Sequence, residues 1–197
     1  MKLYDITQEL FSCKVYEGDP APQVQPLLRM SEGGQYNLSA FSLCAHNGTH
    51  VDAPAHFIKD GKTIEQIPLE VFVGDCSLVR CEGEISAETA EELLEKAHAF
   101  GATERLLIGG DAVVTEEAAA VFAKSQLKLL GNESQSVGPM DAPMKVHQIL
   151  LGKEIVLLEG IVLTDIPEGR YFLNAAPLNT GGLEGSPCRA WLMEVQQ

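Results

Sequence analysis

Several stretches of the chain combine apolar residues in the patterns of β-strands. In residues 36–43, YNLSAFSL, apolar and polar side chains alternate roughly with period two, which predicts a strand that runs into the segment after it. Short apolar runs predict further strands at residues 2–6, at CSLVRC (76–81) and at 106–108. The run LKLLG predicts another strand that ends at Gly131.

Other segments have the period of a helix. In SAETAEELLEKAHAFG, residues 86–101, four apolar side chains follow the i, i+3, i+4, i+7 spacing from Ala90. Ser86 is suited to cap the start of this helix, and Gly101 follows its end. A second helix is expected from Thr115, where two glutamates occupy the first turn.

The order of these elements predicts the class of fold. A strand at 106–108, a helix from Thr115 and a strand ending at Gly131 form a βαβ unit, which implies a parallel strand pair. A short helix over residues 143–151 and a strand in EIVLLEGIVL, bent at Gly160, are expected next, and CRAWLMEV predicts a closing strand. We therefore expect one α/β domain over residues 1–197, with a mixed sheet and few helices.

Composition excludes some classes of partner. The 28 acidic and 14 basic residues give a formal net charge of −14, and no stretch is rich in lysine or arginine. Nucleic acid and anionic membranes are therefore poor partners. The first residues, MKLYDITQEL, lack the apolar core of a signal peptide, and no apolar run reaches membrane-spanning length. The five cysteines form no CxxC pair, so we expect reduced thiols in a cytoplasmic protein.

Three of the five histidines gather in CAHNGTHVDAPAHF, residues 44–57. His46, His50, Asp52 and His56 all have even numbers, so an extended chain would point all four to one face. The glycine, β-branched residues and proline within the segment disfavour a helix. A strand or a strand followed by a loop is the expected conformation.

Two imidazoles and one carboxylate that project together match the ligands of a catalytic zinc or manganese site, because three protein ligands leave a coordination position open. His56 would then remain as an acid–base group. Two alternatives stay open: a solvated loop without function, or a structural metal that also uses Cys44. His98, near the end of the first helix, is expected to be a solvated surface residue.

The same stretch carries a family resemblance. HNGTHVDAPAHF matches the HxGTHxDxPxHF signature of the cyclase-like metal-dependent hydrolases, which include bacterial kynurenine formamidases. YDIT with VYEGDPAP, then HQILLGKEIVLLEGIVL, and finally APLNTGGLEGSPCRAWLM resemble further family segments in the same order. The resemblance therefore covers both ends and the middle of the chain.

The resemblance implies a swivelling β/β/α fold, a homodimer or homotetramer, and two divalent ions per subunit, zinc or manganese. It assigns site residues as follows: His46, His50 and Asp52 to the first metal, Asp52, His147 and Glu159 to the second, and His56 to proton transfer. From the sequence itself, His147 could equally be a core histidine on a short helix. Glu159 follows an apolar run, where a carboxylate is costly to bury without a partner or metal.

Some positions depart from the family pattern. Tyr16 stands where the formamidases have a substrate-binding tryptophan, and Glu17 replaces the following proline. In GNESQSVG, Glu133 and Gly138 replace two aspartates, and the segment after Ile108 is short. The predicted metal ligands are unchanged, so these departures concern the substrate.

The function implied is hydrolysis of a small amide of the arylformamidase type, that is, of a C–N bond other than a peptide bond. A metal-activated water would attack the carbonyl, and His56 would act as acid and base. Hydrolysis of a cyclic amide, such as an isatin-like lactam, or another cyclase-family reaction is the alternative. A metal-binding protein without turnover is the alternative of another class, although it would not need His56.

Overall fold

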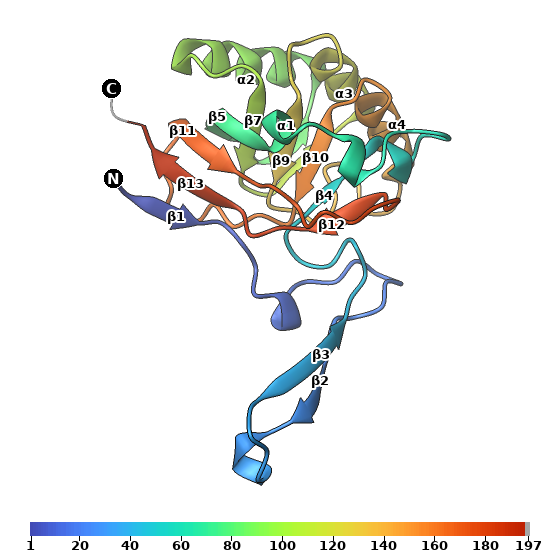
Figure 1. Cartoon of the computed structure of the whole chain (residues 1–197). Coiled ribbons are helices and arrows are strands. Elements are labelled where there is room, and N and C mark those ends of the chain that lie inside the picture. Colours follow the sequence, from blue (N-terminus) through green and yellow to red (C-terminus); the bar gives the residue numbers. More distant parts are fainter. Residues whose placement is uncertain (196–197) are drawn as a thin grey trace.

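A nine-stranded mixed sheet forms the body of the protein in the computed structural model, which describes residues 1–195 (Figure 1). In sheet order the strands are β1 (Leu3–Asp5), β13 (Trp191–Glu194), β11 (Gly169–Asn174), β5 (Val73–Arg80), β7 (Arg105–Gly109), β9 (Leu129–Asn132), β10 (Val156–Glu159), β4 (His50–Asp52) and β12 (Gly185–Pro187). The neighbours β5, β7, β9 and β10 are parallel, and the other pairs are antiparallel. The predicted parallel pair, β7 with β9, is confirmed.

Helices cover one face of this sheet (Figure 1). They are α2 (Ala87–Phe100), α3 (Glu116–Phe122) and α4 (Met144–Leu151), while the single-turn α1 (Leu69–Phe72) leads into β5. Ser86 and Thr115 cap α2 and α3, because each side chain accepts a hydrogen bond from a backbone N–H of the first turn. Among residues 1–195, no helix has the length and apolar character needed to cross a membrane.

An apolar core lies on each face of the main sheet, because successive side chains along a strand point to opposite faces. Leu106 and Ile108 of β7 pack beneath the helices, whereas Leu107 points into the second core on the other face. The second core includes Ile6 and Val51, which come from segments near the two ends of the curled sheet. The predicted mixed α/β fold with few helices is confirmed, in agreement with the swivelling β/β/α class.

Two small strand pairs lie outside the main sheet. β6 (Gly83–Ile85) pairs with β8 (Ala112–Val114), and β2 (Gln23–Leu28) pairs with β3 (Leu38–Ser42). Figure 1 shows that β2 and β3 form an arm that projects away from the body. The strand expected at residues 36–43 is therefore present, but its partner β2 has no clear sequence signal because Pro26 interrupts it. Single 3₁₀ turns occupy Leu10–Ser12, Met30–Glu32, Pro54–His56 and Ile64–Gln66.

The chain turns at Gly160 as expected, but the strand does not continue beyond the turn, because β10 ends at Glu159. Gly160 has φ +66°, and a Cβ on it would lie 2.6 Å from the carbonyl oxygen of Gly48. The chain therefore turns sharply after Glu159. This turn leaves Glu159 as the last residue of β10, next to β4.

Candidate metal centre

Two neighbouring strands present the first three site residues. In the antiparallel pair of β4 and β10, His50 lies opposite Glu159 and Asp52 lies opposite Leu157. Residues directly opposite share a face of the sheet, as do residues two apart on one strand. His50, Asp52 and Glu159 consequently project to the same side.

The other three histidines reach this face from outside the strands. His46 lies in the turn before β4, His56 lies in the 3₁₀ turn Pro54–His56, and His147 lies on α4. Strand alternation thus explains the shared face only for His50 and Asp52. A fully extended chain is the wrong conformation for His46 and His56, whereas the predicted alternative, a strand followed by a loop, describes the segment.

Asp52 lies at the centre of the cluster. Its Oδ1 atom is 2.8 Å from Nδ1 of His46 and 3.4 Å from Nε2 of His50, and its Oδ2 atom is 3.6 Å from Nε2 of His147. The carboxylate therefore turns one oxygen to each of two groups, His46–His50–Asp52 and Asp52–His147–Glu159. In each group the candidate ligand atoms lie within 4.8 Å of one another.

Hydrogen bonds fix the orientation of two imidazoles. Nδ1 of His50 is 2.9 Å from the carbonyl oxygen of Gly48, and Nδ1 of His147 is 2.8 Å from that of Pro143. A carbonyl only accepts, so each Nδ1 carries the proton and each Nε2 of the neutral ring keeps a lone pair toward the site. This is the arrangement found in histidines that bind metals.

Several buried polar atoms of the cluster have no hydrogen-bond partner: Nε2 of His46, Nε2 of His50 and Oδ2 of Asp52. An unpaired buried polar atom costs about 1–3 kcal/mol, so three at one place point to a missing partner. Imidazole nitrogens and carboxylate oxygens are ligands for zinc and manganese, and neither group contains a thiolate. The residues therefore fit divalent ions of the catalytic rather than the structural kind.

The buried charged groups of the cluster shift one another's pKa values. Burial lowers the pKa of His50, but hydrogen bonds to Asp52 and Glu159 outweigh it and raise that pKa to about 10. Burial would raise the pKa of Asp52, yet the neighbouring His46 and His50 hold it well below its usual value. His50 is thus protonated at neutral pH without metal, and an arriving ion must displace this proton.

Glu159 and His147 form a similar pair. Nε2 of His147 lies 3.2 Å from Oε1 of Glu159, and the same oxygen accepts a hydrogen bond from the backbone N–H of Val137. Burial opposes the charged form of both groups. Ion pairing nevertheless raises the pKa of His147, and the histidines beside Glu159 lower the pKa of its carboxyl group. Glu159 is therefore a buried ionised group that is held by partners.

His56 differs from the other histidines of the site. Its ring stacks on that of His46 with 4.1 Å between centroids, and its Nε2 lies 4.0 Å from Oδ2 of Asp52, beyond hydrogen-bond distance. Burial, together with the positive charge of His46 and His147, lowers the pKa of His56. A neutral imidazole next to the carboxylate is suited to accept a proton.

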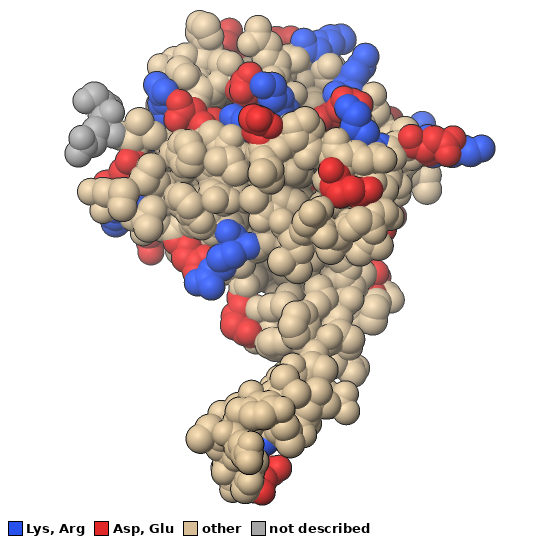
Figure 2. Space-filling view, in the orientation of Figure 1, with Lys and Arg blue, Asp and Glu red and all other residues tan. Residues whose placement is uncertain are grey.

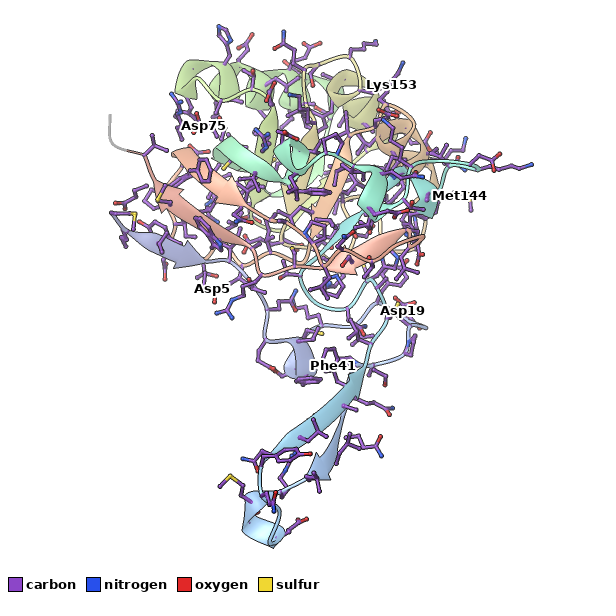
Figure 3. The ribbon with its side chains drawn as sticks, in the orientation of Figure 1. Asp5, Asp19, Phe41, Asp75, Met144 and Lys153 are labelled. Atoms are coloured by element: carbon purple, nitrogen blue, oxygen red, sulfur yellow. The ribbon has the colours of Figure 1, made fainter. Side chains whose placement is uncertain are left out.

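The four histidines of the cluster and Glu159 line a cavity of about 190 Å³. Tyr16 is part of its wall, and its hydroxyl donates a hydrogen bond of 2.6 Å to the carbonyl oxygen of Met140. The sequence reasoning missed five further wall residues: Asp19, Phe57, Gln135, Ser136 and Pro143. Only Phe57 had a signal, its place at the end of the histidine motif. Figure 3 places Asp19 where the arm meets the body.

Glu133, which departs from the family pattern, makes hydrogen bonds that connect neighbouring loops. Its carboxylate accepts hydrogen bonds from the backbone N–H groups of Gly110 and Leu163, at 2.7 and 2.8 Å. It thereby ties together the loops after β7, β9 and β10. His98 is exposed on α2, as predicted.

Gly185 makes room for His46, and a prediction follows. A Cβ at Gly185 would lie 2.6 Å from Cε1 of His46 and 3.1 Å from both ring nitrogens. Gly185→Ala should therefore displace the imidazole and weaken binding of the first ion by roughly 10–100-fold, the scale of lost support for a ligand. Gly181→Ala is the matched control, because a Cβ there meets nothing within 4 Å. Zinc titration that shows equal affinity for both variants would contradict the assignment of His46.

Comparisons with known proteins agree with this picture. The Cyclase family model matches residues 4–139. A kynurenine formamidase of Erythrobacter litoralis (strain HTCC2594) is 30% identical over 207 residues, which cover 98% of this chain and 94% of that protein.

Solved structures also match over the whole length. A predicted metal-dependent hydrolase from Bacillus stearothermophilus superposes with a TM-score of 0.79 and 28% identity over 97% of both chains. Isatin hydrolase A from Labrenzia aggregata shares the fold, with a TM-score of 0.82 at 22% identity over 99% of this chain and 94% of its own. The chain therefore belongs to the Cyclase family.

Proposed function

We propose that the protein is a metal-dependent hydrolase of small amides, of the arylformamidase type. The observation that carries this proposal is the pair of ligand groups that share Asp52, with the neutral His56 beside them. The kinship with a kynurenine formamidase supports a hydrolase that acts on amide C–N bonds. We assign His46, His50 and Asp52 to one divalent ion, and Asp52, His147 and Glu159 to a second.

When bound, divalent ions of this kind supply hydroxide near neutral pH and polarise a carbonyl oxygen. The chain holds its ligands ready for them, since the carbonyl groups of Gly48 and Pro143 orient His50 and His147. The N–H of Val137 likewise fixes Glu159. The low exposure of these side chains limits bulk water around the reacting carbonyl.

His56 moves the proton in this proposal. Addition of water to the carbonyl carbon and cleavage of the C–N bond yield a carboxylate and an amine, and the nitrogen must gain a proton as it leaves. The neutral ring of His56 accepts a proton from the attacking water and returns it to that nitrogen. A protein that only bound metal would not need such a base, so His56 favours an enzyme over a metal-binding protein without turnover.

The cavity favours a small, flat substrate. Its volume is about 190 Å³, and Tyr16 and Phe57 offer two aromatic side chains in its wall. A formyl group on an aromatic amine suits this space, and an isatin-like lactam presents the same type of C–N bond as the second candidate. Zinc and manganese are both accepted by imidazole and carboxylate ligands.

Substrate competition tests the proposal. The protein, loaded in turn with zinc and manganese, should hydrolyse N-formylkynurenine with a larger kcat/KM than isatin. The reverse ranking would move the assignment to cyclic amides. Failure to hydrolyse either compound, with both ions bound, would leave the metal-binding alternative in place of the amidase.

Tyr16 is expected to contribute to substrate binding. Tyr16→Phe keeps the ring but removes the hydrogen bond to Met140, and so loosens one wall of the cavity. A neutral hydrogen bond is worth about 1 kcal/mol, so KM should rise about fivefold with kcat nearly unchanged. Tyr4→Phe is the control, because it removes a hydrogen bond of the same length, to Glu194, outside the cavity. A Tyr16 variant with the kinetics of the Tyr4 variant would remove Tyr16 from the site.

We also propose that the chain acts as one domain in the cytoplasm and as a homo-oligomer. Five free cysteines support a reducing compartment.

A further inference from the structure

Gln135 lies in the wall of the cavity, but the proposed mechanism does not use its side chain. Gln135 is 8% exposed, and its Nε2 atom donates a hydrogen bond of 2.9 Å to the carbonyl oxygen of Gly48. The same oxygen is 2.9 Å from Nδ1 of His50. The Gly48 carbonyl thus accepts two hydrogen bonds, one for each of its lone pairs. Gln135 therefore holds the group that orients a proposed metal ligand.

The Gly48 carbonyl needs such support because no regular element holds it. Gly48 lies between β3 and β4, outside any helix or strand, with φ +63°. The carbonyl of Pro143, which orients His147, has a different setting, since it also accepts a hydrogen bond from the backbone N–H of His147 in the first turn of α4. Helix geometry fixes that carbonyl, whereas the Gly48 carbonyl depends on the side chain of Gln135.

Gln8 fixes the orientation of the Gln135 amide in turn. Nε2 of Gln8 donates to Oε1 of Gln135 at 3.0 Å and to the carbonyl oxygen of Gly160 at 2.7 Å. Oε1 of Gln8 accepts a hydrogen bond from the backbone N–H of Lys14. A carbonyl can only accept and an N–H can only donate, so these backbone groups set which way both amides point. Nε2 of Gln135 must therefore face Gly48.

Gly160 leaves the space that the Gln135 amide occupies. A Cβ on Gly160 would lie 2.7 Å from both Nε2 and Oε1 of Gln135. Gly160 directly follows Glu159, so the turn at the end of β10 accommodates the amide next to a proposed ligand of the second ion. Segments far apart in the sequence thus meet at one carbonyl group.

The supporting donor is neutral, which suits a site for cations. A lysine or arginine could also donate to the Gly48 carbonyl, but its positive charge would repel an arriving ion. Figure 2 shows lysine and arginine side chains on the surface of the body, and neither residue type is present among the described residues that line the cavity. The amide of Gln135 supplies the hydrogen bond without that charge.

We propose that Gln135 is a positioning residue that is held by Gln8 and fixes the Gly48 carbonyl, and through it the imidazole of His50, for the first divalent ion. This inference rests on the proposed function only in its assignment of His50 as a metal ligand. An imidazole that is already held in place loses less freedom when the ion binds. Without Gln135 the carbonyl keeps only His50 as a hydrogen-bond partner, so that carbonyl and ring can move together.

Zinc titration of the metal-stripped protein tests the proposal. Gln135→Met keeps the length of the side chain and removes its hydrogen bonds to Gln8 and Gly48. One of the two zinc-binding steps should weaken by about tenfold, the lower end of the effect of lost support for a ligand. The other step should stay unchanged, because His147 and Glu159 have their own backbone partners.

Gln148→Met is the matched control, since Gln148 follows His147 on α4 but is exposed. It should leave both zinc-binding steps unchanged. In zinc-loaded protein with ¹⁵N-labelled histidine, Gln135→Met should speed the exchange of the Nδ1–H proton of His50 with water. The corresponding proton of His147 should exchange at the wild-type rate, because the carbonyl of Pro143 holds it independently.

A double-mutant cycle separates positioning from a general loss of stability. Gln8 does not line the cavity, and Gln8→Met should weaken the same zinc-binding step by about threefold through the lost hydrogen bond to Gln135. The double variant should bind zinc no more weakly than Gln135→Met alone, because Gln8 acts through Gln135. Gln8→Met also carries the test if Gln135→Met does not fold.

Three results would overturn the proposal: equal zinc affinity of wild type and Gln135→Met, equal weakening of both steps, or fully additive losses in the double variant. A wild type that binds no zinc would overturn this inference together with the metal centre. Zinc binding does not depend on turnover. A protein that binds two ions with the expected effect of Gln135→Met, but hydrolyses no amide, would therefore refute the proposed function and support this inference.

Discussion

Replacement of Asp52 by alanine should abolish metal binding and hydrolysis together. One carboxylate faces both ligand groups, with Oδ1 toward His46 and His50 and Oδ2 toward His147. Its loss removes a ligand from each ion at once. Because Lewis-acid catalysis supplies several kcal/mol, kcat/KM should fall by roughly 10⁴-fold or more. Metal content after dialysis should fall from about two ions per chain toward none.

A matched control separates this effect from damage to the fold. Asp75→Ala removes a carboxylate of the same size, which pairs with Arg170 at the surface. This variant should retain both ions and full activity. Asp52→Ala should stay folded without metal but should lose the rise in Tm that zinc gives to the wild type. An Asp52→Ala protein with normal metal content and activity would refute the shared-ligand assignment.

Replacement of His56 by alanine should separate chemistry from metal binding. The ring of His56 lies near Asp52 without a hydrogen bond to it, and both ligand groups are complete without it. The variant should therefore keep two ions per chain while kcat falls by about 10²–10⁴-fold, the usual contribution of an acid–base group. The acid side of the pH profile should lose the step that reflects His56, whose pKa lies below the ordinary histidine value.

His98→Ala is the matched control for this experiment, since His98 is exposed on α2. It should leave both metal content and kcat unchanged. A second comparison uses an ester of the same acyl group. Its oxygen leaves more readily than an amine, so His56→Ala should impair ester hydrolysis less than amide hydrolysis. Equal rates for wild type and His56→Ala on the amide would exclude proton transfer by His56.

Local patterns were sufficient for much of the fold. The apolar stripe and caps of α2, the period of α3 and the buried run of β5 are each set by neighbours in the sequence, and all three elements are present. The βαβ spacing also led to the correct parallel pair, because a crossover helix constrains its two strands. β2, β11 and β12 were not predicted. β11 and β12 acquire strand structure from partners far along the chain, whereas Pro26 interrupts the pattern of β2.

For the candidate site too, local sequence patterns predicted some residue positions and not others. His50 and Asp52 could be placed on one face from strand alternation alone, whereas His46 and His56 reach that face through a turn and a 3₁₀ turn. The register of β4 against β10, which sets Glu159 opposite His50, has no local signal. The second ligand group was therefore available only through the family resemblance.

In the proposed mechanism, hydrolysis of the amide requires both bound divalent ions and His56. We would first measure hydrolysis of N-formylkynurenine by protein stripped of metal with a chelator, followed by stepwise addition of zinc or manganese. Activity should be absent at first and should rise with metal until about two ions are bound per chain. Full activity of the stripped protein, or continued inactivity after two ions have bound tightly, would contradict a metal-dependent amidase mechanism.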